Sequence, residues 1–246
     1  MKRREILAAS LVILLIWQLL AILIHQPILP GPALVLRTFV SELGRGLVGH
    51  FWASLWRVVA SILLAVLIAA PLGIILGQSA RMNQIFSPFV YILYPIPKVV
   101  FVPVVLLLLG IGNFPKIFLI FMILFFQILV LVRDQAASIK GELIQSVRSL
   151  GAGRRALFRY VYLPASLPAI LTALRQSVGT AVAVLYIAEL FATQKGLGYY
   201  ISLNGSTLFN YPAMYAGVLA MSILGLGLYF SVDWVERKFC RWKFVL

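Results

Sequence analysis

The sequence predicts an all-α protein that crosses a lipid bilayer about six times. Hydrophobic residues make up 62% of the 246 residues, charged residues make up only 11%, and the mean hydropathy is +1.02. Ordinary soluble domains carry about 25% charged residues. A chain this apolar is expected to lie in lipid. Helices are the expected spanning elements there, because a helix satisfies its own backbone polar groups.

Six apolar runs are long enough to be the spans. A hydrocarbon core about 30 Å thick needs about 20 helical residues at about 1.5 Å each. The runs extend from Ile6 to Ile24, Trp52 to Leu76, Phe89 to Leu109, Ile117 to Val132, Ala169 to Phe191 and Ala213 to Val232. The segments between them leave no room for a soluble domain, so a single domain over residues 1–246 is predicted.

The first run has an alternative interpretation as a signal peptide, because Lys2, Arg3 and Arg4 precede it. It is longer than the about 7 to 15 residues of a signal-peptide core, and no small-x-small cleavage site follows it. An uncleaved helix is therefore favoured. After this run, apolar residues between Leu34 and Leu43 recur at helical spacing, which predicts a short helix along the membrane interface.

The distribution of basic residues predicts that both termini are cytoplasmic. With the N-terminus inside, the inner segments carry Lys2, Arg3, Arg4, Arg81, Arg133, Lys140, Arg148, Arg154, Arg155, Arg159, Arg237, Lys238, Arg241 and Lys243. The outer segments carry only Arg37, Arg45, Lys116 and Lys195. This asymmetry follows the positive-inside rule. It also explains the net charge of +14, so nucleic acid is not an expected partner.

The sequence offers little for enzymatic chemistry. A phosphate-binding Walker loop needs Gly-x4-Gly-Lys-Ser/Thr, and the stretch from Gly151 to Arg155 has neither that spacing nor the lysine. There are seven acidic residues in all, and Cys240 is the only cysteine, so neither an acid/base pair nor a cysteine metal site is expected. If transport here uses ATP, a separate chain must hydrolyse it.

The polar segment 133–168 interrupts the apolar pattern. Gly151 is expected to reverse the chain between two short helices, 145–150 and 154–160, because glycine tolerates a positive φ. Pro164 is expected to stop the second helix, because proline lacks an N–H. Leu150, Leu157, Phe158 and Val161 are expected to form an apolar flank. This pattern favours a docking device over a plain basic loop.

The same segment resembles the coupling loop of the permeases of binding-protein-dependent ABC importers. The family motif is Glu-Ala-Ala, three residues, Gly, nine residues, Ile, one residue and Leu-Pro. The chain has Gln145-Ser146-Val147, Gly151, Val161 and Leu163-Pro164 at these spacings, with changed identities in the triplet and at Val161. Further matches resemble the nitrate/sulfonate/taurine branch: Ser54-Leu-Trp-Arg57, Pro95-Ile-Pro97-Lys98, Gly110-Ile-Gly112, and Glu189-Leu-Phe followed by Gly196-Leu-Gly198-Tyr199.

The resemblance implies the transmembrane subunit of an ATP-driven importer in a bacterial or archaeal inner membrane. It implies two ATPase subunits that hold ATP-Mg, a second permease copy or homologue, an extracytoplasmic solute-binding protein and surrounding lipid, with no cofactor bound by this chain. The coupling residues implied are Gln145, Ser146, Val147, Leu150, Gly151, Ala152, Arg154, Leu157, Phe158, Val161, Leu163 and Pro164.

Polar residues inside the apolar runs are candidates for the translocation path, because a charge at the bilayer centre costs about 3 kcal/mol. Lys98 follows two prolines, so broken backbone is expected between Tyr94 and Pro103. We expect Lys98, with Tyr94 and Gln127, to favour an anionic solute, and the resemblance implies that Glu189 lies near the outer gate. The alternatives are that Lys98 pairs with Glu189 or extends to the interface.

Two other functional classes stay open at this point. An ATP-independent carrier or channel would need its own acidic relay, and only Glu189 lies within the runs. A membrane enzyme would need the acid/base groups that the sequence lacks. The family resemblance leaves the solute open among nitrate, sulfonates, taurine, bicarbonate and vitamin precursors. The sequence also leaves open whether the dimer contains two copies of this chain or two different permeases.

Overall fold

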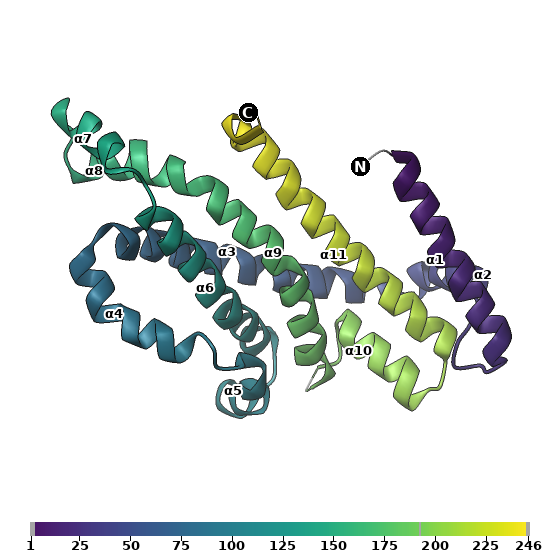
Figure 1. Ribbon diagram of the computed structural model, residues 1–246. Coiled ribbons are helices and arrows are strands. Elements are labelled where there is room, and N and C mark those ends of the chain that lie inside the picture. The colour runs from purple at the N-terminus through teal and green to yellow at the C-terminus, as the bar shows by residue number, and fades with distance from the viewer. Residues whose placement is uncertain (1–2, 192, 245–246) are drawn as a thin grey trace. The chain divides into compact units, whose positions relative to one another are not determined.

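The computed structural model describes residues 3–191 and 193–244, and every regular element in these ranges is helical (Figure 1). The α-helices are α1 (Arg3–Ile24), α2 (Pro32–Glu42), α3 (Val48–Gln78), α4 (Ala80–Leu93), α5 (Val102–Leu109), α6 (Asn113–Ala137), α7 (Gly141–Ser149), α8 (Arg154–Leu157), α9 (Leu163–Leu190), α10 (Leu197–Ser202) and α11 (Tyr211–Phe239). Short 3₁₀ turns cover Lys98–Phe101 and Arg241–Phe244, and π-helical turns cover Leu43–Leu47, Phe158–Tyr162 and Leu203–Thr207.

The chain divides into two compact units. Unit 1 consists of Met1–Leu55 and Glu189–Leu224, and unit 2 consists of Trp56–Ala188 and Gly225–Leu246. The short helix expected between Leu34 and Leu43 is present in unit 1 as α2, which continues through a kink at Gly46 into α3.

Close packing of α3 against α6 organises unit 2. A Cβ atom on Gly73 would lie 2.9 Å from both the Leu129 carbonyl oxygen and the Val132 Cβ. The two backbones can approach only because this position has no side chain. One turn later, the Gln78 amide donates a hydrogen bond to the Ala136 carbonyl. The surrounding hydrophobic cluster includes Val58, Ala65, Ala69, Ile120, Leu124, Ile128, Ala181 and Leu185.

In unit 1, α10 packs against α11 at another glycine. A Cβ on Gly217 would lie 2.8 Å from side-chain atoms of both Tyr200 and Ile201. Trp17 of α1 donates a hydrogen bond from Nε1 to the Pro30 carbonyl at 3.1 Å, and its ring lies 5.9 Å from that of Tyr215. These contacts hold the first helix against the rest of the unit.

Four helical stretches of the described chain are long and apolar enough to cross a membrane: 32–78, 113–137, 154–190 and 211–239. A fifth is reached if the pair 80–93 and 98–109 counts as one span. The first apolar run is helical as expected, but its apolar helix Ala8–Ile24 is shorter than these. The count of six stays a prediction.

The apolar run from Phe89 to Leu109 is not one continuous helix. The helices on either side of residues 94–97 are bent by 75° from each other (Figure 1). Pro95 and Pro97 supply no backbone N–H, so the helical hydrogen-bond ladder ends there. The expected broken backbone after Tyr94 is confirmed, whereas Pro103 lies in the first turn of α5, where proline is tolerated.

Candidate functional site

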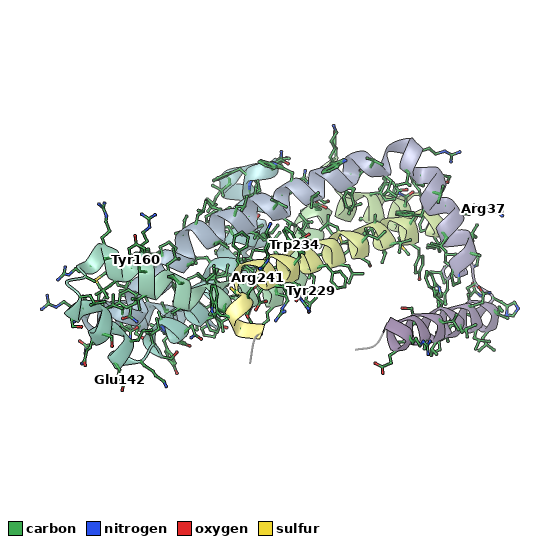
Figure 2. All side chains as sticks on the ribbon, turned by 90° about the horizontal axis from the view of Figure 1, so that it is seen from above. Arg37, Glu142, Tyr160, Tyr229, Trp234 and Arg241 are labelled. Carbon is green, nitrogen blue, oxygen red and sulfur yellow. The ribbon has the colours of Figure 1, made fainter. Side chains whose placement is uncertain are left out.

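The predicted docking loop is built from α7, a turn at Gly151 and α8. Gly151 has a φ of 80°, and its N–H donates to the Arg148 carbonyl at 2.9 Å. A Cβ at Gly151 would meet no atom within 4 Å, so only the left-handed backbone requires glycine here. The chain reversal expected at Gly151 is therefore confirmed. Glu142 and Tyr160 mark this end of unit 2 in Figure 2.

The stop expected at Pro164 is wrong. Helical structure continues without interruption from Arg154 to Leu190. Residues 158–162 form a π-helical turn in which the Leu163 N–H bonds to the Phe158 carbonyl, five residues back. This wider turn accommodates the proline ring, because Pro164 has no N–H to place in the usual bond to the carbonyl four residues back.

The apolar residues of the loop face two ways. Leu157 and Val161 are buried, while Leu150 is 86% exposed and Tyr160 is 69% exposed. Leu150 is therefore not part of the predicted flank. Of the other candidate residues, Gln145, Ser146, Arg154 and Leu163 are exposed, and Val147, Ala152, Phe158 and Pro164 are half-buried. The loop therefore presents two large side chains with apolar surface, Leu150 and Tyr160, to its surroundings.

Three of the four candidate translocation residues meet at one cavity in unit 2. Tyr94, Lys98 and Gln127 line a cavity of about 310 Å³ at the break between α4 and α5. Ligand cavities begin at about this size. The remaining lining residues are Ile96, Pro97, Val99, Ile123, Phe126 and Thr180.

The ammonium group of Lys98 is held by backbone oxygens and an aromatic ring. It donates to the carbonyls of Leu93 and Tyr94, each at 2.6 Å, and lies 4.6 Å from the centre of the Phe126 ring. These carbonyls end α4, so a cation is favourable beside them. Lys98 is only 9% exposed, and no carboxylate pairs with it among the residues that the structure describes.

Phe126 and Thr180 line the cavity but are not among the residues predicted from the sequence. Thr180 carries the same signal as Gln127, a hydrogen-bonding side chain within an apolar run. Phe126 carries no such signal, because one aromatic residue among many gives no hint of contact with a cation. Within the described chain, the Gln127 side-chain oxygen is buried and has no hydrogen-bond donor. The cavity therefore combines a buried cation with an amide.

Glu189 lies in unit 1 and does not line this cavity. Its carboxylate is fully buried and accepts hydrogen bonds from the Ser54 hydroxyl at 2.8 and 2.9 Å and from the Gly198 N–H at 2.9 Å. The Leu197 N–H in turn donates to the Ser54 Oγ at 2.8 Å. Glu189 thus fastens the segment after α9 to the start of α3.

Further hydrogen bonds within unit 1 hold the segment between α9 and α10 in place. The Gly196 N–H donates to His50 Nδ1 at 3.1 Å, and Gly196 has a φ of 133° that favours glycine. The Tyr200 hydroxyl donates to Glu42 at 2.9 Å. Burial, and then the adjacent Glu42 carboxylate, raise the pKa of Tyr200 above its usual value, so this hydroxyl stays a donor. The loop between α9 and α10 is therefore held from both sides.

The chain is helical and apolar, and its sequence has no Walker loop. Its exposed loop carries Gly151 and Leu163-Pro164 at the spacing of the ABC importer motif, which is typical of the permease class. The comparisons agree. The family described as "Binding-protein-dependent transport system inner membrane component" matches residues 69–241, and this chain belongs to that family. The chain is the transmembrane subunit of an ABC importer, a multi-pass inner-membrane component, and hydrolysis of ATP belongs to a separate subunit.

Relatives cover nearly the whole chain. A probable ABC transporter permease protein of Brucella abortus is 34% identical over 217 residues, which is 88% of this chain and 86% of that protein. The taurine transport system permease protein of Escherichia coli is 30% identical over 239 residues, 94% of this chain and 86% of its own length. The inward-facing MetNI methionine ABC transporter has a TM-score of 0.66 at 22% identity, covering 78% of this chain and 95% of that chain, and so shares the fold.

Proposed function

We propose that Gln145–Pro164 is the surface on which the ATPase subunit docks, and that the cavity beside Lys98 is part of the path of a small anionic solute. The observation that supports docking is Leu150, which projects from the Gly151 turn with 86% of its surface exposed. Tyr160 adds a second exposed apolar group on the same loop. Burial of these apolar groups against a partner is energetically favourable.

The docking proposal is tested with Leu150→Asp. Leu150 is so exposed that the change leaves the fold of this chain intact, whereas a carboxylate in an apolar docking groove is strongly unfavourable. We expect the ATPase subunit, identified by mass spectrometry and by its hydrolysis of ATP, to co-purify with wild type in mild detergent and to be lost from the variant.

The matched control is Leu208→Asp, at a leucine that is 59% exposed in unit 1, outside the loop. This control is expected to retain the ATPase. Equal retention of the ATPase by both variants would contradict the docking proposal.

An anionic solute is supported by the unpaired charge at the cavity. Lys98 is buried beside about 310 Å³ of space and has carbonyls, not a carboxylate, as its polar partners within the described chain. A cation in such a position favours an anion in the cavity. The permease named for taurine, which carries a sulfonate group, is among the relatives, and a sulfonate-type solute is consistent with this cavity.

Lys98→Gln tests the anionic solute in reconstituted importer with saturating binding protein. Removal of a charge-assisted hydrogen bond costs about 1.5–3 kcal/mol, so the uptake rate is expected to fall about 10- to 100-fold. Lys98→Arg keeps the charge and is expected to stay close to wild type. Because Lys98 also caps α4, the unfolding temperature of each variant is measured as a control. Wild-type uptake by Lys98→Gln would exclude the proposal.

The assembly proposed around the chain has two permeases, two ATPase subunits that hold ATP-Mg, and an extracytoplasmic binding protein. We propose one permease domain over residues 1–246 with both termini in the cytoplasm. Inverting a 1:99 population of two conformations takes about 5.5 kcal/mol of differential binding, and ATP binding to the partner subunits would supply it.

A further inference from the structure

A second cavity lies beside the docking loop, entirely within unit 2. It has a volume of about 440 Å³ and opens between the α3–α4 junction on one side and the end of α7, α8 and the following π-helical turn on the other. Its polar lining consists of Gln78, Ser79, Arg148, Arg154 and Tyr162, and its apolar lining consists of Ile74, Ile75, Met82, Leu157 and Phe158. Half of the lining belongs to the segment proposed to dock the ATPase, but the cavity also extends to the α3–α4 junction, which lies outside that segment.

The positive charge of the cavity lining favours the binding of an anion. Arg148 and Arg154 come from α7 and α8, and the structure gives neither guanidinium group a hydrogen-bond or ion-pair partner among the residues it describes. Two cations that line one cavity create a positive potential, which favours an anion between them. The Ser79 Oγ accepts from the Met82 N–H at 3.4 Å, which leaves its hydroxyl hydrogen available to the same anion.

The apolar side of the cavity identifies the kind of anion. The candidate span 32–78 ends at Gln78, so the cavity is expected to lie at the level where hydrocarbon meets headgroups. Ile75 and Met82 are 42% and 36% exposed there, next to the two arginines. A free inorganic anion gains nothing from contact with this apolar surface. A phospholipid can place its phosphate beside the arginines and bury its first methylene groups against Ile75 and Met82.

We propose that this cavity binds the headgroup of an acidic phospholipid from the leaflet on the side of the docking loop. The phosphate lies between Arg148 and Arg154, close to the Ser79 hydroxyl. Such a lipid connects the end of α3 to the loop and fixes the position from which the loop meets its partner.

The buried Cys240 provides the measurement. It is the only cysteine of the chain and is fully buried in the core of unit 2, so a thiol-reactive fluorogenic dye reports unfolding of the unit that contains the cavity. The full chain in neutral detergent is heated alone, with phosphatidylglycerol, with phosphatidylcholine and with inorganic phosphate. At about ten times its dissociation constant, a bound ligand raises the unfolding temperature by about 3–6 °C.

The test variant is the double change Arg148→Gln with Arg154→Gln. The matched control is Arg155→Gln with Arg159→Gln, which removes the same charge from the same loop at exposed arginines that do not line the cavity. We expect phosphatidylglycerol alone to stabilise wild type and the control, and to lose this effect in the test variant.

Three outcomes overturn the proposal. If the lipid-induced shift persists in the test variant, the lipid binds elsewhere. If both double variants lose it equally, only the net charge of the loop matters. If inorganic phosphate reproduces the whole shift, the cavity binds a free oxyanion and not a lipid. None of these outcomes depends on the ATPase, so the docking proposal is tested separately.

Discussion

Lys98 and Glu189 are both ionisable and both buried, and each forms hydrogen bonds to groups of its own unit. Lys98 has two carbonyl oxygens, while Glu189 has a serine hydroxyl and a backbone N–H. In each case the group has a hydrogen bond to a position that must be held in place: the end of α4 for Lys98 and the loop before α10 for Glu189. Hydrogen bonding of this kind offsets much of the cost of burying a charge.

Glu189→Gln is expected to release the loop between α9 and α10. The amide turns a donor toward the Ser54 hydroxyl or the Gly198 N–H, and a lost hydrogen bond to a charged group costs about 1.5–3 kcal/mol. Trypsin cleavage after the exposed Lys195 should accelerate about tenfold or more, because cleavage follows the population of the open loop. Gln194→Asn, a neutral change at an exposed neighbouring position, is the control and should cleave at the wild-type rate. An unchanged rate in Glu189→Gln would refute this role.

Sequence reasoning at the residue scale succeeded where a polar side chain interrupts an apolar run. Tyr94, Lys98 and Gln127 were selected on that basis, and the structure places them around one cavity. It could not place Glu189, because its partner Ser54 is 135 positions away in the chain and carries no charge to suggest a pair. Whether these residues contact a solute stays a prediction.

At the scale of elements, the interface between α3 and α6 depends on two glycines one turn apart. At Gly77 a Cβ would lie 2.7 Å from the Ala136 Cβ and 2.9 Å from the Ala137 nitrogen. Both neighbours belong to the helix itself and not to the end of a flexible side chain, so they have little freedom to move. Gly77 therefore sets the distance between the two helices.

Gly77→Ala is expected to destabilise the chain by about 1–3 kcal/mol, because overpacking forces helices apart. That corresponds to a fall of about 5 °C in the unfolding temperature, measured with the thiol dye on Cys240. Gly179→Ala is the control: it also adds one methyl group to a helix, but at an exposed position with no atom within 4 Å of the new Cβ. Equal effects of the two changes would show that packing against α6 is not the cause.

Apolar runs predicted where helices lie better than where helices end. The runs around Trp52–Leu76 and Ile117–Val132 fall inside α3 and α6, because length and hydropathy are properties of the run itself. The end expected at Pro164 failed, since a proline is tolerated when the preceding turn widens, and no local signal in the sequence announces a π-helical turn. The same residue type did end the helical ladder at Pro95 and Pro97.

At the scale of the whole molecule, orientation in the membrane is predicted by charge alone. Cysteines placed at Glu142 and at Gln194, both exposed, lie on sides predicted to be opposite. A membrane-impermeant maleimide is expected to label Gln194→Cys in intact cells and Glu142→Cys only after permeabilisation. Wild type is the control, because its single Cys240 is buried and should react in neither case. Labelling of Glu142→Cys in intact cells would show that the orientation is the opposite of the one predicted.

The uninterrupted helix that begins at Arg154 in the docking loop makes the loop one end of a lever. Its 37 residues, at about 1.5 Å each, extend over about 55 Å. A rotation of about 5° at the loop would carry the far end through about 5 Å, which is on the order of one helical turn. A chain that broke at Pro164 would absorb such a rotation in a flexible joint. The π-helical turn at residues 158–162 keeps this helix continuous. A small movement of the ATPase at the loop can therefore be transmitted along the helix into the membrane.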